Sequence, residues 1–126
     1  MPATGTARTA KRKSSKNEST NQVQLQGRLA DAPEHRELPS GDEVVTFRLV
    51  VTREAPSNAS RRSRSTVDTI DCTIWSGRLR RTSGTWTPGD ILTVEGALRR
   101  RFWRSPAGPR SRYDVEVTAA TRVATT

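Results

Sequence analysis

Apolar and polar side chains alternate with a period of two in several stretches of this chain. In residues 23–29, Val23, Leu25, Gly27 and Leu29 fall on one face, and Gln24, Gln26 and Arg28 on the other. Successive side chains of a β-strand point to opposite faces, so this pattern predicts a half-buried strand. The same alternation recurs in four further stretches, residues 44–52, 69–75, 91–103 and 112–119.

The segments between these strands are rich in Pro, Gly, Ser and Arg. Residues 31–42 and 104–112 are predicted to be turn-rich or loop connections, and residues 54–66 a long flexible loop. Residues 77–86 could hold a short helical turn, which Gly84 and the Thr and Ser content weaken. Five strands with one helical interruption after the third predict an all-β, five-stranded OB-fold barrel.

The length of 126 residues fits one domain. Residues 1–20 hold almost no large apolar side chain, so we expect a disordered basic tail, which either contacts phosphates or is simply solvated. Residues 21–123 are predicted to form the folded domain, and residues 124–126 the end of the chain.

The net charge is +9, with 22 Lys and Arg against 13 Asp and Glu, and almost all of the basic residues are Arg. Guanidinium groups bind phosphates and stack on bases, so this composition suits nucleic acid. The alternative is a basic surface that serves solubility alone.

The sequence gives little support to catalysis, metal binding or membrane insertion. His35 is the single histidine, Cys72 is the single cysteine and falls on a core face, and there is no Gly-rich phosphate loop. No apolar run approaches the ~20 residues that span a bilayer. The N-terminus has no apolar stretch typical of a secretory signal. We therefore expect a binding protein with no cofactor.

Two tryptophans occupy strand positions that should face water. Trp75 has the parity of Asp71 and Thr73, and Trp103 has the parity of Arg99 and Arg101. An aromatic ring beside Arg, outside the core register, can stack on an unpaired base while the guanidinium groups contact phosphates. The alternative is a subunit interface or a barrel end, and Trp86, beside a Pro-Gly turn, is expected to pack at a barrel end.

The remaining candidate DNA contacts are arginines on strands, in the helical segment and in the two basic loops. The loops could wrap a flexible strand, or they could be solvated and variable. Together with the two tryptophans, the candidates are Arg99, Arg101, Arg48, Arg28, Arg61, Arg62, Arg64, Arg78, Arg110 and Arg112.

Five segments in order resemble the DNA-binding domain of bacterial single-stranded-DNA-binding (SSB) proteins, over Asn21–Val123. These segments are NQVQLQGRLADAPEHRELPSG, FRLVVTRE, DCTIWSGRL, PGDILTVEGALRRRFW and RYDVEVTA. The family-like positions within them are Pro33, Glu34, Arg36, Pro39, Gly41, Gly89, Glu95, Gly96, Leu98, Arg101 and Trp103.

The resemblance implies a homo-oligomer of OB folds, a tetramer or a dimer, that binds single-stranded DNA with little sequence preference during replication, recombination or repair. It implies a cytoplasmic, nucleoid-associated protein and base stacking at Trp75 and Trp103. Two other stacking positions of the family fall on Thr69 and around Ala55, and a position that supports subunit assembly is Ile70. Fewer stacking rings should weaken binding per subunit or shift it towards Arg.

The sequence ends in TRVATT, which contains no acidic residue. We therefore do not expect recruitment of other proteins through the acidic C-terminal tip that many members of this family carry. Three alternatives remain open: a primosomal OB dimer, an OB protein that prefers RNA, and an OB module that binds protein.

Overall fold

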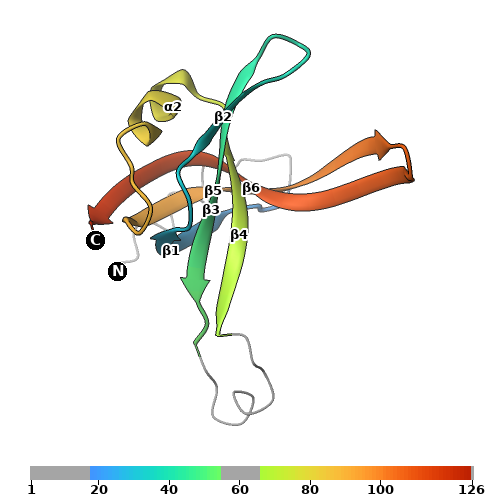
Figure 1. The fold of residues 1–126 in the computed structure, drawn as a ribbon. Helices are drawn as coiled ribbons and strands as arrows, with labels where there is room; N and C mark the ends of the chain where they lie inside the picture. Colours follow the sequence, from blue (N-terminus) through green and yellow to red (C-terminus); the bar gives the residue numbers. More distant parts are fainter. Residues whose placement is uncertain (1–17, 55–65, 126) are drawn as a thin grey trace.

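The computed structural model describes residues 18–54 and 66–125. The described residues form six strands and one short helix (Figure 1). In chain order these are β1 (Val23–Leu29), β2 (Glu34–Glu37), β3 (Glu43–Thr52), β4 (Val67–Ile74), α2 (Gly77–Ser83), β5 (Ile91–Ser105) and β6 (Gly108–Ala124). No helix within them has the length and apolar character needed to cross a membrane.

Five of these strands close into a barrel. The strand order is β1-β5-β6-β4-β3-β2, and β1 also pairs with β3, which joins the two ends of the five-strand set and leaves β2 as an edge strand. The β4–β6 pair is parallel and the other pairs are antiparallel. The described residues therefore confirm the predicted five-stranded OB barrel with a short helix after its third strand.

The core consists of the apolar side chains that the period-two pattern placed on inward faces. The fully buried set includes Leu29, Val45, Leu49, Ile74, Leu92 and Val94. Burying each aliphatic side chain of this size contributes about 1.5–3 kcal/mol. Trp86 is buried, as predicted, and its ring meets Phe47 edge to face at 5.4 Å between centroids.

The helix α2 is short because both of its ends are fixed. At its start, the Ser76 hydroxyl accepts a hydrogen bond from the Leu79 N–H at 3.3 Å, the arrangement of an N-cap. At its end, the Gly84 N–H donates to the Arg81 carbonyl at 3.1 Å. The predicted helical turn at 77–86 is confirmed, with its helical part at Gly77–Ser83.

Two predicted connections are wrong. Residues 31–42 contain the strand β2, whose residues pair with β3 from Glu34↔Thr46 to Glu37↔Glu43. Residues 104–112 are a tight hairpin rather than a loop, because β5 runs to Ser105 and β6 starts at Gly108. Arg110 and Arg112 therefore lie on a strand. The expected loop at 54–66 and the expected tail at 1–20 lie almost wholly outside the described residues.

Two glycines permit close backbone contacts where strands cross to close the barrel. A Cβ on Gly27 would lie 2.3 Å from the Val50 carbonyl oxygen, where β1 passes from β5 to β3. A Cβ on Gly96 would lie 2.0 Å from the Glu116 carbonyl oxygen, beside the register shift between Glu95 and Gly96. Only a residue without a side chain fits these positions.

We expect Gly96→Ala to destabilise the fold by about 1–3 kcal/mol or more, since neither backbone can move without loss of the β5–β6 pairing. Urea unfolding measures the change. The matched control is Gly77→Ala, whose Cβ meets only the ends of Arg80 and Arg81 side chains, at 3.4 and 3.6 Å. This control should change stability by no more than about 1 kcal/mol. Equal stability of wild type and Gly96→Ala would contradict the packing argument.

Asp90 holds the turn before β5. Its fully buried carboxylate accepts hydrogen bonds from the Thr87 N–H at 2.9 Å and the Thr87 hydroxyl at 3.1 Å, and lies 3.6 Å from the Arg122 guanidinium. The Thr87 hydrogen bonds, with the charge of Arg122, lower the pKa of Asp90. The stabilisation is therefore present above the unfolded pKa of about 3.9 and is lost as pH falls through the folded pKa.

We expect Asp90→Asn to lower the melting temperature at neutral pH, and the gap from wild type to narrow as pH falls below about 4. Thermal unfolding across a pH series measures this gap. Asp42→Asn, which removes an exposed turn carboxylate, is the control and should show little change. A gap that stays constant down to about pH 2 would show that the charge of Asp90 does not stabilise the fold.

Candidate nucleic-acid interface

The β5–β6 hairpin projects beyond the barrel as a two-stranded arm (Figure 1). Directly opposed residues of an antiparallel pair lie on the same face. The register pairs Arg101 with Arg112 and Trp103 with Arg110. These four residues and Arg99, which shares the parity of Arg101, define what we call the basic face of the hairpin.

The basic face joins the outer surface of the barrel at Trp75, which follows the last residue of β4. The Arg101 guanidinium lies over the Trp75 ring, 5.7 Å from its centroid. Trp75 is 37% exposed and Trp103 is 46% exposed, so both rings are accessible. The structure therefore brings the two predicted stacking residues, which are far apart in sequence, to the same side of the molecule.

A buried carboxylate ties the hairpin to the barrel. Asp114 of β6 is 3% exposed, accepts a hydrogen bond from the Thr73 hydroxyl of β4 at 2.7 Å, and receives the Arg101 Nε at 3.1 and 3.2 Å. Asp114 therefore positions Arg101, and Arg101 in turn lies against Trp75. The Arg101 Nη2 is buried and has no hydrogen-bond partner among the described residues.

The opposite face of the hairpin carries a second aromatic group. The Arg100 guanidinium lies 5.0 Å from the Phe102 ring centroid and 5.3 Å from the Tyr113 ring centroid. Phe102 is 71% exposed, because β5 at this point has left the barrel. Tyr113 shares the parity of Val115 and Val117 on β6, but it is exposed and only the two valines reach the core.

The other candidate arginines of the described residues lie outside the hairpin. Arg48 is on the outer face of β3, where it pairs with Asp31. Arg28 is on β1 beside Val50 of β3, and Arg78 is exposed on α2. Arg61, Arg62 and Arg64 lie outside the described residues.

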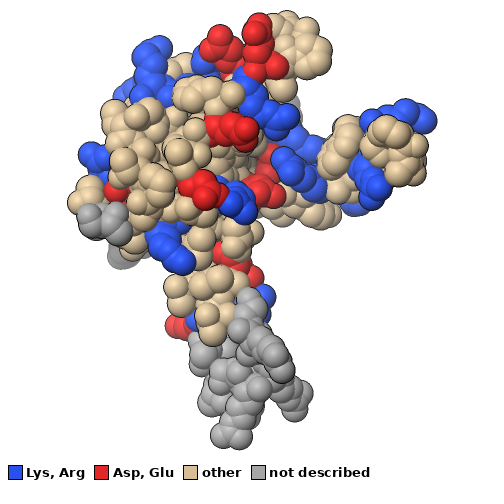
Figure 2. Space-filling view, viewed as in Figure 1, with Lys and Arg blue, Asp and Glu red and all other residues tan. Residues whose placement is uncertain are grey.

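Positive charge is concentrated on the hairpin. Figure 2 shows Arg side chains gathered over the projecting arm, with acidic groups where the arm meets the barrel. Two arginines of the basic face are ion-paired, Arg99 with Glu116 at 2.8 Å and Arg101 with Asp114 at 3.1 Å. Arg110 and Arg112 form no ion pair with any described residue, so they are the two arginines of the basic face that are available to phosphates.

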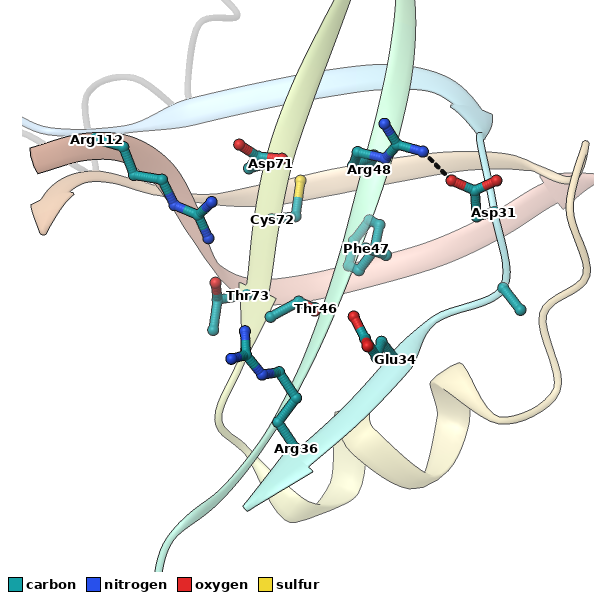
Figure 3. A pocket seen from close by; sticks show the side chains of 11 residues that line it. Asp31, Glu34, Arg36, Thr46, Phe47, Arg48, Asp71, Cys72, Thr73 and Arg112 are labelled. Carbon is teal, nitrogen blue, oxygen red and sulfur yellow. Dashed lines mark hydrogen bonds and ion pairs between the residues drawn. The ribbon is translucent and has the colours of Figure 1, made fainter. Parts of the chain in front are cut away.

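A cavity of about 370 Å³ lies on the outer face of β3 and β4, beside the basic face. Figure 3 shows side chains from β2, β3, β4 and β6 around it, with Cys72 and Phe47 at its wall. Burial raises the pKa of the Cys72 thiol to about 12, with smaller effects of the Asp71 and Asp114 charges. The thiol therefore stays protonated at neutral pH, which agrees with its predicted core position.

Sequence reasoning missed the acidic side chains of this surface, chiefly Asp71 and Asp114. A hairpin turn at residues 106–107 puts Arg99 opposite Asp114 on β5 and β6. The sequence would therefore have indicated this pairing if the turn had been predicted there. Asp71 shares the parity of Trp75, but its neighbours across the strands follow only from the β3–β4 and β4–β6 registers.

Among the described residues, no three His, Cys, Asp or Glu side chains gather as a metal ion would require.

Comparison with known proteins identifies the family. A model described as the single-strand binding protein family matches residues 20–124. A single-stranded DNA-binding protein of Thermotoga maritima is 36% identical over 100 residues, which are 79% of this chain and 69% of that protein. Single-stranded DNA-binding protein 1 of Staphylococcus aureus is 32% identical over 90 residues, 71% of this chain but only 52% of that protein.

The fold is also similar to that of a solved SSB structure. A solved structure titled "Plasmodium falciparum SSB complex with ssDNA" superposes with a TM-score of 0.72 and 19% identity, over 86% of this chain and 99% of that one. The likeness supports the OB barrel on which the two tryptophans and the arginines are arranged. Because the family model covers residues 20–124 and the barrel has the same architecture, the chain belongs to the single-strand binding protein family.

Proposed function

We propose that this protein binds single-stranded DNA without strong sequence preference, and so protects and organises it during replication, recombination or repair. The observation that carries the proposal is the placement of two exposed tryptophans, Trp75 and Trp103, on one surface with the basic face of the hairpin. Exposed aromatic rings can stack on the unpaired bases of a single strand. In a duplex the bases are stacked on one another and are not available to these rings.

Two kinds of side chain would contact the DNA, aromatic rings and guanidinium groups. Trp75 and Trp103 stack on bases, and Arg110 and Arg112 contact phosphates. Arg101 is held by Asp114 and keeps its positive charge beside the Trp75 ring, where a bound strand would pass. More distant contacts along a wrapped strand are assigned to Arg28, Arg48, Arg61, Arg62, Arg64, Arg78 and Arg99.

The remaining features of the proposal concern assembly and place of action. Residues 21–123 form the DNA-binding domain, and the basic residues 1–20 add phosphate contacts. The protein works as a homo-oligomer, a tetramer or a dimer, in the cytoplasm on the nucleoid. It acts by binding and catalyses no reaction, in keeping with a family whose curated relatives are named for DNA binding.

We expect an oligo-dT of about 35 nucleotides to quench the tryptophan fluorescence, and duplex DNA of that length to do so weakly. Trp75→Ala and Trp103→Ala should each weaken binding by ~1–3 kcal/mol, since each removes a stacking surface. Val123→Ala removes an exposed apolar side chain near the end of β6, away from the hairpin, and is the control that should leave the affinity unchanged. Equal affinity for duplex and single strand, or undiminished binding by both tryptophan variants, would remove the stacking assignment.

We expect log K to fall linearly with log salt concentration, with a slope of about −0.7 per phosphate contacted. Arg110→Ala should make this slope shallower by about 0.7, because it removes one phosphate contact. Arg81→Ala, on α2 away from the hairpin, is the control and should leave the slope unchanged. A slope that is the same in wild type and Arg110→Ala would contradict the phosphate contact.

A further inference from the structure

The cavity on the outer face of β3 and β4 is lined by equal numbers of basic and acidic side chains. Its charged lining residues are Arg36, Arg48, Arg112, Asp31, Glu34 and Asp71. Their charges cancel, whereas the neighbouring hairpin is strongly basic. Carboxylates repel phosphates, so three carboxylates would weaken a surface that bound only phosphates. The balance of charge instead suits a group with both donors and acceptors, such as a nucleobase.

The three carboxylates differ in their burial and in the hydrogen bonds and ion pairs that they form within the protein. Asp31 pairs with Arg48, and this hydrogen bond and charge raise the pKa of Arg48, with a lesser contribution from Asp71. Glu34 lies on the exposed edge strand β2. Asp71 is half-buried, and its carboxylate makes no hydrogen bond or ion pair with the side chain of another described residue, although its charge acts on Arg48. Asp71 therefore has acceptor oxygens to offer to a ligand.

The surroundings of Asp71 place it next to the proposed path of the DNA. It lies opposite Arg48 in the β3–β4 register, four residues before Trp75, which directly follows β4. In Figure 3 its carboxylate lies on the side of β4 that faces Arg112 of the basic face. A strand whose base stacks on Trp75 and whose phosphates meet Arg112 passes over this cavity.

A carboxylate distinguishes the bases by their hydrogen-bond donors. Guanine presents a ring N–H beside an amino group, which can donate two hydrogen bonds to the two carboxylate oxygens. Cytosine and adenine each offer an amino group beside a ring acceptor. Thymine offers one N–H between two carbonyl oxygens, and these oxygens repel a carboxylate.

We propose that this cavity is a base-binding subsite in which Asp71 selects bases that carry an amino group, guanine above all, and disfavours thymine. The inference rests on the proposed function, since it concerns the same bound strand. It makes Asp71 a specificity-determining residue within a binding surface whose stacking and phosphate contacts are otherwise sequence-tolerant.

The test is a competition titration against a labelled oligo-dT, with full-length protein. The competitors are oligonucleotides of one length in which every third thymine is replaced by guanine or by hypoxanthine, which keeps the ring N–H but lacks the amino group. Wild type should bind the guanine oligonucleotide at least about fivefold tighter than the hypoxanthine one or oligo-dT, as expected for a two-bond contact to a base edge.

Asp71→Asn should abolish this preference and bind oligo-dT at least as tightly as wild type does, because a repulsive charge is gone. Asp42→Asn makes the same change of charge in the β2–β3 turn, away from the cavity, and should keep the preference. Circular dichroism shows whether each variant is folded.

Equal binding of all three oligonucleotides by wild type would overturn the inference and leave the proposed function standing. Retention of the guanine preference by folded Asp71→Asn would also overturn it. Failure of wild type to bind any single strand would overturn the proposed function itself, and the base-selection inference with it.

Discussion

Barrel closure depends on backbone contact at two glycines. β1 can pair with β5 along one part and with β3 at its end only because Gly27 lets the Val50 carbonyl approach, and β5 can bend over β6 only because Gly96 leaves room for the Glu116 carbonyl. These crossings allow β4 to pair side by side with β6, where the Thr73 hydroxyl donates a hydrogen bond to Asp114. The position of the hairpin, and hence of Trp103 relative to Trp75, follows from this closure.

The division of charge over the surface gives the binding site two different regions. The hairpin carries a concentration of arginines, of which Arg110 and Arg112 form no ion pair with a described residue, so it attracts phosphates. The cavity beside it has a balanced set of charges, so it is suited to a base rather than to the backbone. A strand that crosses both regions can be held tightly by the first while the second discriminates among its bases.

The sequence predicted what depends on local periodicity. The barrel strands, the inward faces of β1 and β3, the buried Trp86 and the short α2 all follow from patterns within about ten residues. The sequence does not predict the hairpin because Pro106, Gly108 and Pro109 are typical of loops, although Pro109, the second residue of β6, pairs with Arg104 near the end of the hairpin. The cavity depends on registers between strands that are distant in sequence, and no local pattern reports these.

The Phe102–Arg100–Tyr113 group has a consequence for how the hairpin works. An arm that extends past its barrel has no core beneath it, and a lone two-stranded ribbon is marginally stable in water. The stacked guanidinium and rings across the two strands, together with the anchored Asp114, replace that missing support. The arm is thus preorganised before any ligand arrives, so that less conformational entropy is lost when a flexible polymer settles onto it.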